Sequence, residues 1–198
     1  DTVDSDTDSR LTDEIIASTE DNEVYLPSER RMVTEDGKFY RYTGTKIPEA
    51  ALQTDATQTY AKGFTDMITF AGETYTTSKT HICRWDQGVV FNATFYAFAA
   101  DATISPNVPH PALNFESNAF YGDYNLLLRM TAAAGTPATI LTLSTDNVIT
   151  ALGVDRGTGK MLIATTSALN ISGTVSNINR LMWYDGFSNK VLKSVIVD

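Results

Sequence analysis

Imidazole and thiol side chains are the scarcest chemically reactive groups in this chain. It has two histidines and one cysteine. His81 and Cys83 would lie on the same face of a strand, because side chains two residues apart alternate back to one side. A closed zinc site needs four ligands, and His110 is the one further candidate of this type. We therefore predict no metal site and no cofactor, and we expect Cys83 to be a small buried apolar side chain.

A glycine-rich segment from Gly153 to Lys160 superficially resembles a phosphate-binding loop. That loop needs four residues between the first glycine and the Gly-Lys pair, followed by Ser or Thr. Here five residues separate Gly153 from Gly159, and Met161 follows the lysine. The segment therefore predicts a glycine-rich turn between strands.

Three aspartates near the N-terminus have the spacing that opens a calcium loop. Such a loop also needs Gly at its sixth place and Glu at its twelfth, which here are Ser9 and Ile15. We therefore interpret Asp4, Asp6 and Asp8 as part of a solvated acidic arm.

Catalytic constellations are not apparent in the sequence. No G-x-S-x-G nucleophile elbow is present, and nothing pairs any two of the carboxylates at Asp66, Glu73, Asp86, Glu116 and Asp123 for glycoside cleavage. We expect a protein that is not an enzyme, with a small hydrolase as the minor alternative.

Aromatic side chains at or near the predicted turns are the main candidates for contacts with a ligand or receptor. Aromatic rings beside polar turns can stack on sugars. Alternatively, such rings fill the ends of a sandwich or a subunit interface. The candidates are Trp85, Tyr121, Tyr124, Trp183, Tyr184 and Phe187.

Composition and periodicity both favour β-structure. Threonine, which suits strands better than helices, occurs 28 times. Strand-like segments recur at roughly ten-residue spacing, which predicts a mainly β fold with an antiparallel β-sandwich or jelly-roll-like body. We expect one long extended segment over 73–85 and hairpins over 31–42, 139–154 and 180–197. The loops expected to form contact surfaces are 105–111, 118–124 and 185–189.

Charge divides the chain unevenly. The formal charge is −9, and residues 1–23 hold nine acidic side chains and one arginine, leaving 15 acidic and 14 basic side chains in the rest. We expect an acidic N-terminal arm over 1–23, a hairpin and linker over 24–62, and a β-rich body over 63–198. A short helix over 8–18 would carry an apolar stripe of Leu11, Ile15 and Ile16. A nearly neutral body argues against nucleic-acid binding.

Membrane insertion is not expected, because no stretch of 18 or more apolar residues exists. The sequence that begins at Asp1 also shows no signal-peptide pattern.

Two aromatic hairpins have the same design, Lys38–Ile47 and Leu181–Leu192. Each places an aromatic-rich strand before a glycine turn and an aliphatic return. This design resembles hairpins of tailed-bacteriophage fibre and appendage proteins. The resemblance implies a virion structural protein, assembled in the host cytoplasm as a homotrimer. Its arm would dock to other virion proteins through Asp4, Asp6, Asp8, Leu11, Ile15 and Ile16.

In such a protein the body would present a receptor-binding surface to a host-surface glycan or protein. The alternatives are a glycan-binding β-sandwich module and a capsid decoration protein.

Overall fold

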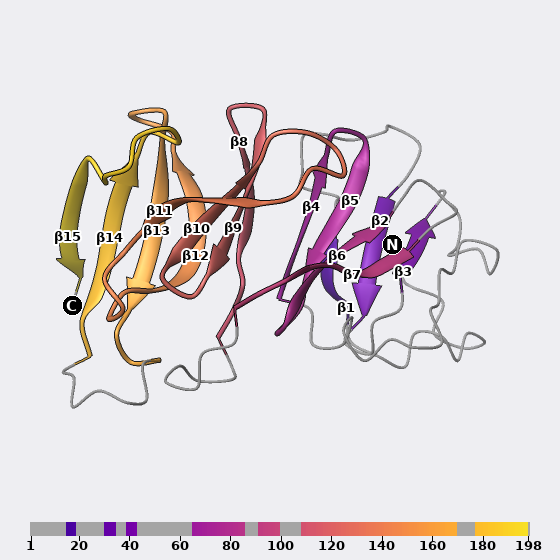
Figure 1. Cartoon of the computed structure of the whole chain (residues 1–198), viewed down its shortest axis with the longest axis horizontal. Helices are drawn as coiled ribbons and strands as arrows, with labels where there is room; N and C mark the ends of the chain where they lie inside the picture. The colour runs from indigo at the N-terminus through magenta and orange to yellow at the C-terminus, as the bar shows by residue number, and fades with distance from the viewer. Residues whose placement is uncertain are drawn as a thin grey trace. The chain divides into compact units, whose positions relative to one another are not determined.

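Every regular element that the structure describes is a β-strand (Figure 1). The structure is a computed structural model, and it describes residues 15–18, 30–34, 39–42, 65–85, 91–99, 108–169 and 177–197. The strands form antiparallel sheets, so the predicted mainly β, antiparallel class is confirmed. The chain divides into two compact units, 1–95 and 96–198. The predicted body, 63–198, spans parts of both units, and the boundaries expected near residues 23 and 62 stay predictions.

A three-stranded sheet of the first unit corrects one prediction and confirms another. Its order is β1 (Ile15–Ser18), β2 (Arg30–Thr34) and β3 (Phe39–Tyr42). The hairpin predicted over 31–42 is confirmed by the β2–β3 pairing. The helix predicted over 8–18 is wrong at residues 15–18, which pair with β2. Two consecutive β-branched isoleucines suit a strand, and β2 offers a ladder for their backbone. The rest of that helix lies outside the described residues.

A four-stranded sheet follows in the first unit, with the order β4 (Asp66–Phe70), β5 (Glu73–Thr77), β6 (His81–Trp85) and β7 (Phe91–Ala97). The single extended segment predicted over 73–85 is wrong, because the chain turns between β5 and β6. The Ser78 hydroxyl oxygen accepts hydrogen bonds from the backbone N–H of Thr80 and His81, at 3.3 and 3.1 Å. Such a serine side chain stabilises a turn in competition with a strand ladder.

Two four-stranded sheets, each an antiparallel meander in sequence order, make up the second unit (Figure 1). Such a meander is the unit that β-propellers repeat, and it lacks the Greek-key connections of a jelly roll. The first sheet contains β8 (Ala112–Phe115), β9 (Asn118–Asp123), β10 (Leu126–Met130) and β11 (Ala138–Thr142). The second contains β12 (Val148–Asp155), β13 (Lys160–Thr166), β14 (Asn179–Tyr184) and β15 (Lys193–Val197).

The connections test the remaining hairpin predictions. The hairpin over 180–197 is confirmed by the pairing of β14 with β15, and a turn over 156–159 joins β12 to β13 as predicted. The hairpin over 139–154 is wrong, because β11 pairs with β10 whereas β12 pairs with β13. The short connection between β11 and β12 therefore passes from one sheet to the next.

Apolar side chains from both sheets form the core of the second unit. They alternate along the strands with side chains of the opposite face, and burying each contributes about 1.5–3 kcal/mol. The backbone of Gly122 lies close to β12, because a Cβ there would stand 2.9 Å from Ile149 Cγ2. The buried core side chains are Phe115, Phe120, Leu127, Leu141, Ile149, Met161, Ile163, Met182 and Tyr184.

Candidate functional site: a pocket between two sheets

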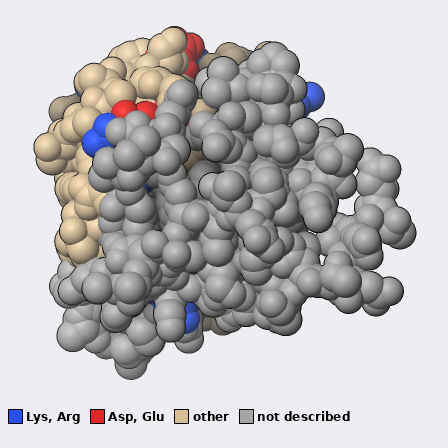
Figure 2. Space-filling view, turned by 90° about the vertical axis from the view of Figure 1, so that its right-hand side faces the viewer, with Lys and Arg blue, Asp and Glu red and all other residues tan. Residues whose placement is uncertain are grey.

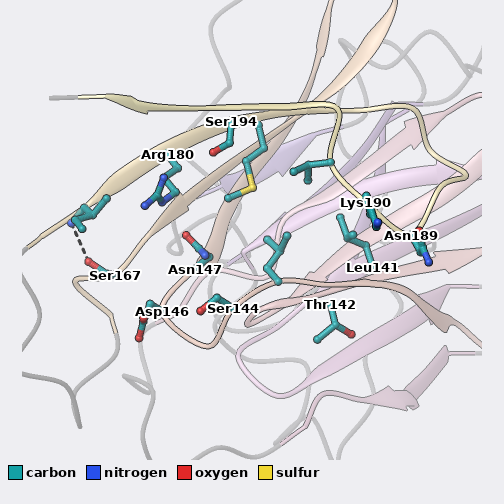
Figure 3. A pocket seen from close by; sticks show the side chains of 14 residues that line it. Leu141, Thr142, Ser144, Asp146, Asn147, Ser167, Arg180, Asn189, Lys190 and Ser194 are labelled. Atoms are coloured by element: carbon teal, nitrogen blue, oxygen red, sulfur yellow. Dashed lines mark hydrogen bonds between the residues drawn. The ribbon is translucent and has the colours of Figure 1, made fainter.

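A pocket of about 630 Å³ lies within the second unit, lined by residues of both sheets (Figure 3). We call it the inter-sheet pocket. The first sheet contributes the end of β11, and the connection 143–147 adds polar groups. The second sheet contributes β14 and β15 with the connection between them. The lining residues are Leu141, Thr142, Leu143, Ser144, Asp146, Asn147, Ser167, Ile178, Arg180, Met182, Asn189, Lys190, Val191 and Ser194.

Strand alternation on β14 places one cation beside the apolar core. Met182 and Tyr184 are buried in the core between the sheets. Arg180 lies two residues before Met182, so its side chain projects to the same face. Across the β14–β15 pair, Met182 stands opposite Ser194. The short side chain of Ser194 leaves room beside Met182, and both residues line the pocket.

Hydrogen bonds hold the polar wall of the pocket in place. The backbone N–H of Asn147 donates to Ser144 O at 2.8 Å, which fixes the turn between β11 and β12. The Oδ1 atom of Asn147 accepts a hydrogen bond from the Thr165 hydroxyl at 3.4 Å. The Ser167 hydroxyl oxygen accepts one from the Ile178 N–H at 2.8 Å. These hydrogen bonds hold the side chains of Asn147 and Ser167 in place. The side-chain NH2 group of Asn147 remains a potential hydrogen-bond donor to a ligand in the pocket.

Three charged side chains line the pocket, namely Arg180, Lys190 and Asp146. Arg180 is half-buried, whereas Lys190 and Asp146 are exposed. Arg180 and Asp146 are not within salt-bridge distance of each other in the part of the chain that the structure describes. The pocket thus combines an apolar floor with two cationic groups and one anionic group, which is a lining suited to binding a small polar molecule.

The predicted aromatic contacts do not gather at this pocket. Within the described lining no residue is aromatic. Tyr121 and Tyr184 are fully buried, so neither ring is available at the surface. The Tyr184 hydroxyl donates a hydrogen bond to Ser188 O at 2.6 Å, and burial raises the pKa of this phenol to about 12. The side chain of Trp85 lies outside the described residues.

The other three aromatic candidates lie at separate places in the second unit. Tyr124 is half-buried, with its ring edge-on to His110 at a centroid distance of 5.3 Å. Phe187 is 60% exposed in the β14–β15 connection, and its ring centroid lies 6.0 Å from the Arg129 guanidinium carbon. Trp183 alternates with Met182 and Tyr184 and therefore projects from the face of β12–β15 that is turned away from the pocket.

Trp183 is held by polar partners on that outer face. Its indole N–H donates to Asp155 Oδ2 at 2.8 Å, and Lys193 Nζ lies 4.8 Å from its ring centroid. Hydrogen bonds from the Thr158 hydroxyl and then from Trp183 lower the pKa of the Asp155 carboxyl. Because Asp155 and Lys193 already contact the Trp183 ring, a ligand could contact only the rest of it.

Most of the predicted docking residues lie outside the part of the chain that the structure describes. These are Asp4, Asp6, Asp8 and Leu11, whereas Ile15 and Ile16 belong to strand β1. Of the three predicted contact loops, 118–124 is wrong, because residues 118–123 form β9, where Ala119 and Phe120 are buried. Residues 185–189 do form a loop, and 105–107 lie outside the described residues.

A buried polar cluster near the start of the second unit was missed at the sequence level. The His110 ring stacks on Phe98 at a centroid distance of 3.8 Å, and its Nδ1 donates to Gly122 O at 3.0 Å. Asp123, 1% exposed, accepts a hydrogen bond from the Ala99 N–H through Oδ2 at 3.2 Å. Burial raises the pKa of this carboxyl to about 6. Strand alternation could have predicted the burial of Asp123, because it places this residue on the same face of β9 as the buried Ala119 and Tyr121.

Potential metal ligands do not converge within the part of the chain that the structure describes: no three His, Cys, Asp or Glu side chains are placed to share an ion. Cys83 is buried, as predicted, and burial raises the pKa of its thiol to about 12. Such a thiol is a poor nucleophile. Glu73 and Arg84 form an ion pair across the β5–β6 hairpin.

On the face in Figure 2, described residues are mostly uncharged, with small neighbouring groups of blue and red atoms. The described residues also contain no helix long and apolar enough to cross a bilayer.

Comparisons with known proteins reveal similarity of fold alone. No family model and no curated protein matches the chain. An extracellular domain of a hybrid two-component system from B. thetaiotaomicron matches 88% of this chain at 15% identity, with a TM-score of 0.59. A second structure of the extracellular domain of the same protein, there described as a one-component system, matches 78% at 16% identity, with a TM-score of 0.52. The chain spans 21% of each of these two structures.

The computationally designed Ika8 protein matches 86% of this chain at 13% identity, with a TM-score of 0.52, and the match covers 47% of Ika8. These three structures are not phage proteins, and the resemblance to phage appendages stays a prediction.

Proposed function

We propose that this chain is a non-catalytic recognition domain that binds a small polar ligand in the inter-sheet pocket. The observation that carries the proposal is the pocket itself, whose volume of about 630 Å³ is in the range of small-molecule sites. Its lining mixes an apolar floor with serine, asparagine and charged groups, so a ligand would be both desolvated and oriented. This proposal develops the glycan-binding alternative but moves the contact from aromatic turns to the pocket.

The similar structures give this proposal a setting. Two of them are structures of the extracellular domain of one bacterial protein, described as a one- or two-component system, and a recognition role agrees with such a location. Fold similarity alone does not establish function, so the argument rests on the pocket. The virion role remains a separate proposal that depends on the arm, residues 1–23.

A plugged pocket tests the proposal. Ser144 lines the pocket in the connection after β11, and Ser144→Trp should fill part of its volume with an indole ring. The matched control is Thr139→Trp, which adds the same side chain at an exposed position of β11 that does not line the pocket. Both variants are first checked for folding by circular dichroism.

The measurement is a thermal-shift screen against mono- and disaccharides, hydroxy acids and amino acids, followed by calorimetric titration of each hit. We expect at least one ligand whose binding Ser144→Trp abolishes and Thr139→Trp leaves unchanged. Hits that bind both variants equally well, or a library without a single hit, would refute the pocket as a recognition site.

A further inference from the structure

Arg180 is the charged residue of β14, and its side chain lies on the core-facing side of the strand, where it lines the inter-sheet pocket. It stands opposite Thr165 on β13 and Ile196 on β15. Its neighbour two residues along the strand, Met182, is buried. An arginine in such a position loses part of its hydration, and a well-placed anion can offset part of this cost.

The guanidinium has no anionic partner in the described residues. Asp146, the acidic residue of the pocket lining, forms no ion pair with it. Arg180 lines the pocket together with Asn147 and Ser194 (Figure 3). The amide and hydroxyl groups of these two residues are neutral hydrogen-bond donors. Arginine presents a planar fork of N–H donors that matches the two oxygens of a carboxylate.

A second cation and the absence of rings both favour recognition by charge. Lys190 lines the pocket from the β14–β15 connection, as does Asn189 (Figure 3). Two cations against one acid leave the described lining with a positive formal charge. Neutral sugars are typically held by stacking on aromatic rings, and the described lining contains none.

From this arrangement we infer that the inter-sheet pocket selects a small polyhydroxylated ligand carrying an oxyanion, such as a uronic acid, with Arg180 as its anchor. The inference rests on the proposed recognition function and specifies its ligand class. Arg180 binds the two oxygens of the anion, Lys190 adds attraction at the other end, and Asn147, Ser144 and Ser194 bind hydroxyl groups. Asp146 opposes the anion by charge repulsion.

The test compares three ligands that differ at one carbon: galacturonate, galactose and galactose 6-sulfate. Calorimetric titrations use the whole chain and its variants Arg180→Gln, Arg180→Lys and Asp146→Asn. The matched control is Arg156→Gln, because Arg156 is an exposed arginine in the turn at the far end of β12. Circular dichroism confirms that each variant is folded.

We expect galacturonate to bind at least about 10-fold more tightly than galactose, the effect of one hydrogen-bonded charge. Arg180→Gln should remove this preference, Arg180→Lys should retain part of it, and Arg156→Gln should retain all of it. Asp146→Asn should tighten galacturonate binding. Binding of galactose 6-sulfate as well as galacturonate supports a site for oxyanions in general, and binding of galacturonate alone supports a carboxylate site.

Equal affinity for galacturonate and galactose, or an Arg180→Gln variant that keeps the preference for the acid, would overturn the inference. If Ser144→Trp still abolishes binding in that case, the recognition function stands and the anion selectivity does not. Failure of the wild-type chain to bind either acid also overturns the inference, whereas the recognition function is judged by the library screen.

Discussion

The indole N–H of Trp183 donates a hydrogen bond to Oδ2 of Asp155 at 2.8 Å, across 28 residues of sequence. Because β13 lies between β12 and β14, this bond ties the turn after β12 to the strand beyond its neighbour. Asp155 also accepts hydrogen bonds from the Gly157 N–H at 2.9 Å and the Thr158 hydroxyl at 2.6 Å. One carboxylate therefore organises the whole β12–β13 turn.

Removing this carboxylate should destabilise the second unit. We expect Asp155→Ala to lower the midpoint of thermal unfolding, whereas Asp146→Ala, in the exposed turn before β12, should have a smaller effect. The pKa of Asp155 is lowered by its hydrogen bonds. The stabilisation is thus present above the pKa of the unfolded chain and is lost as the pH falls through the lower pKa of the folded chain. Thermal melts at pH 7 and in the acid range measure both effects, and a variant as stable as wild type would contradict this role.

The carboxyl of Asp123 should give the stability a pH dependence of the opposite sign. Burial raises its pKa to about 6, above the usual value near 3.8, so the folded chain holds this proton more tightly than the unfolded chain. Its contribution to stability is greatest below the unfolded pKa and is lost as the pH rises toward 6.

Replacing Asp123 with Asn keeps an acceptor for the Ala99 N–H and removes the buried charge. We expect Asp123→Asn to raise the free energy of unfolding by about 1–3 kcal/mol at pH 7.5 and to change it little near pH 4. Urea titrations at the two pH values provide the comparison. A variant that is less stable than wild type at pH 7.5 would mean that the ionised carboxyl has a stabilising partner.

Gly122 offers a sharp test of how the two sheets pack. An added Cβ would lie 2.9 Å from Ile149 Cγ2 and 3.0 Å from Pro111 Cδ. Neither atom can move far, since one is on a β-branched side chain and the other is in a ring. We expect Gly122→Ala to cost about 1–3 kcal/mol of unfolding free energy. Gly153→Ala is the matched control, because no atom lies within 4 Å of its added Cβ, and equal stability of the two variants would argue against this packing.

The sequence predicted the β class of the fold correctly. It predicted less well which strands pair with each other. Strand positions could be read from alternation, and the hairpins expected over 31–42 and 180–197 are the pairs β2–β3 and β14–β15. Whether two neighbouring strands pair is decided by long-range contacts. The Ile149 N–H bonds to Tyr124 O at 2.7 Å and the Leu143 N–H bonds to Asn125 O at 2.9 Å, so the chain crosses between sheets where a hairpin was predicted.

The candidate pocket was harder to foresee than the fold. Aromatic residues near turns were expected to be exposed, yet Tyr121 and Tyr184 are buried, because strand alternation turned them inward. Arg180 carried a signal that was readable in retrospect: it precedes Met182 and Tyr184 on the apolar face of one strand. The other walls of the pocket come from segments as distant as Leu141 and Ser194, and no local pattern brings these segments together.

Amide chemical-shift mapping tests the recognition site most directly. On titration of the isotope-labelled chain with galacturonate, we predict that the shifted amides belong to the segments 141–147, 178–182 and 189–194, which contain most of the residues that line the inter-sheet pocket. The amides around Trp183's partner Asp155 should not move. Shifts confined to the β12–β13 turn or to the loop that carries Phe187 would contradict the proposal that the pocket is the binding site. They would instead favour the surface around Trp183 or Phe187.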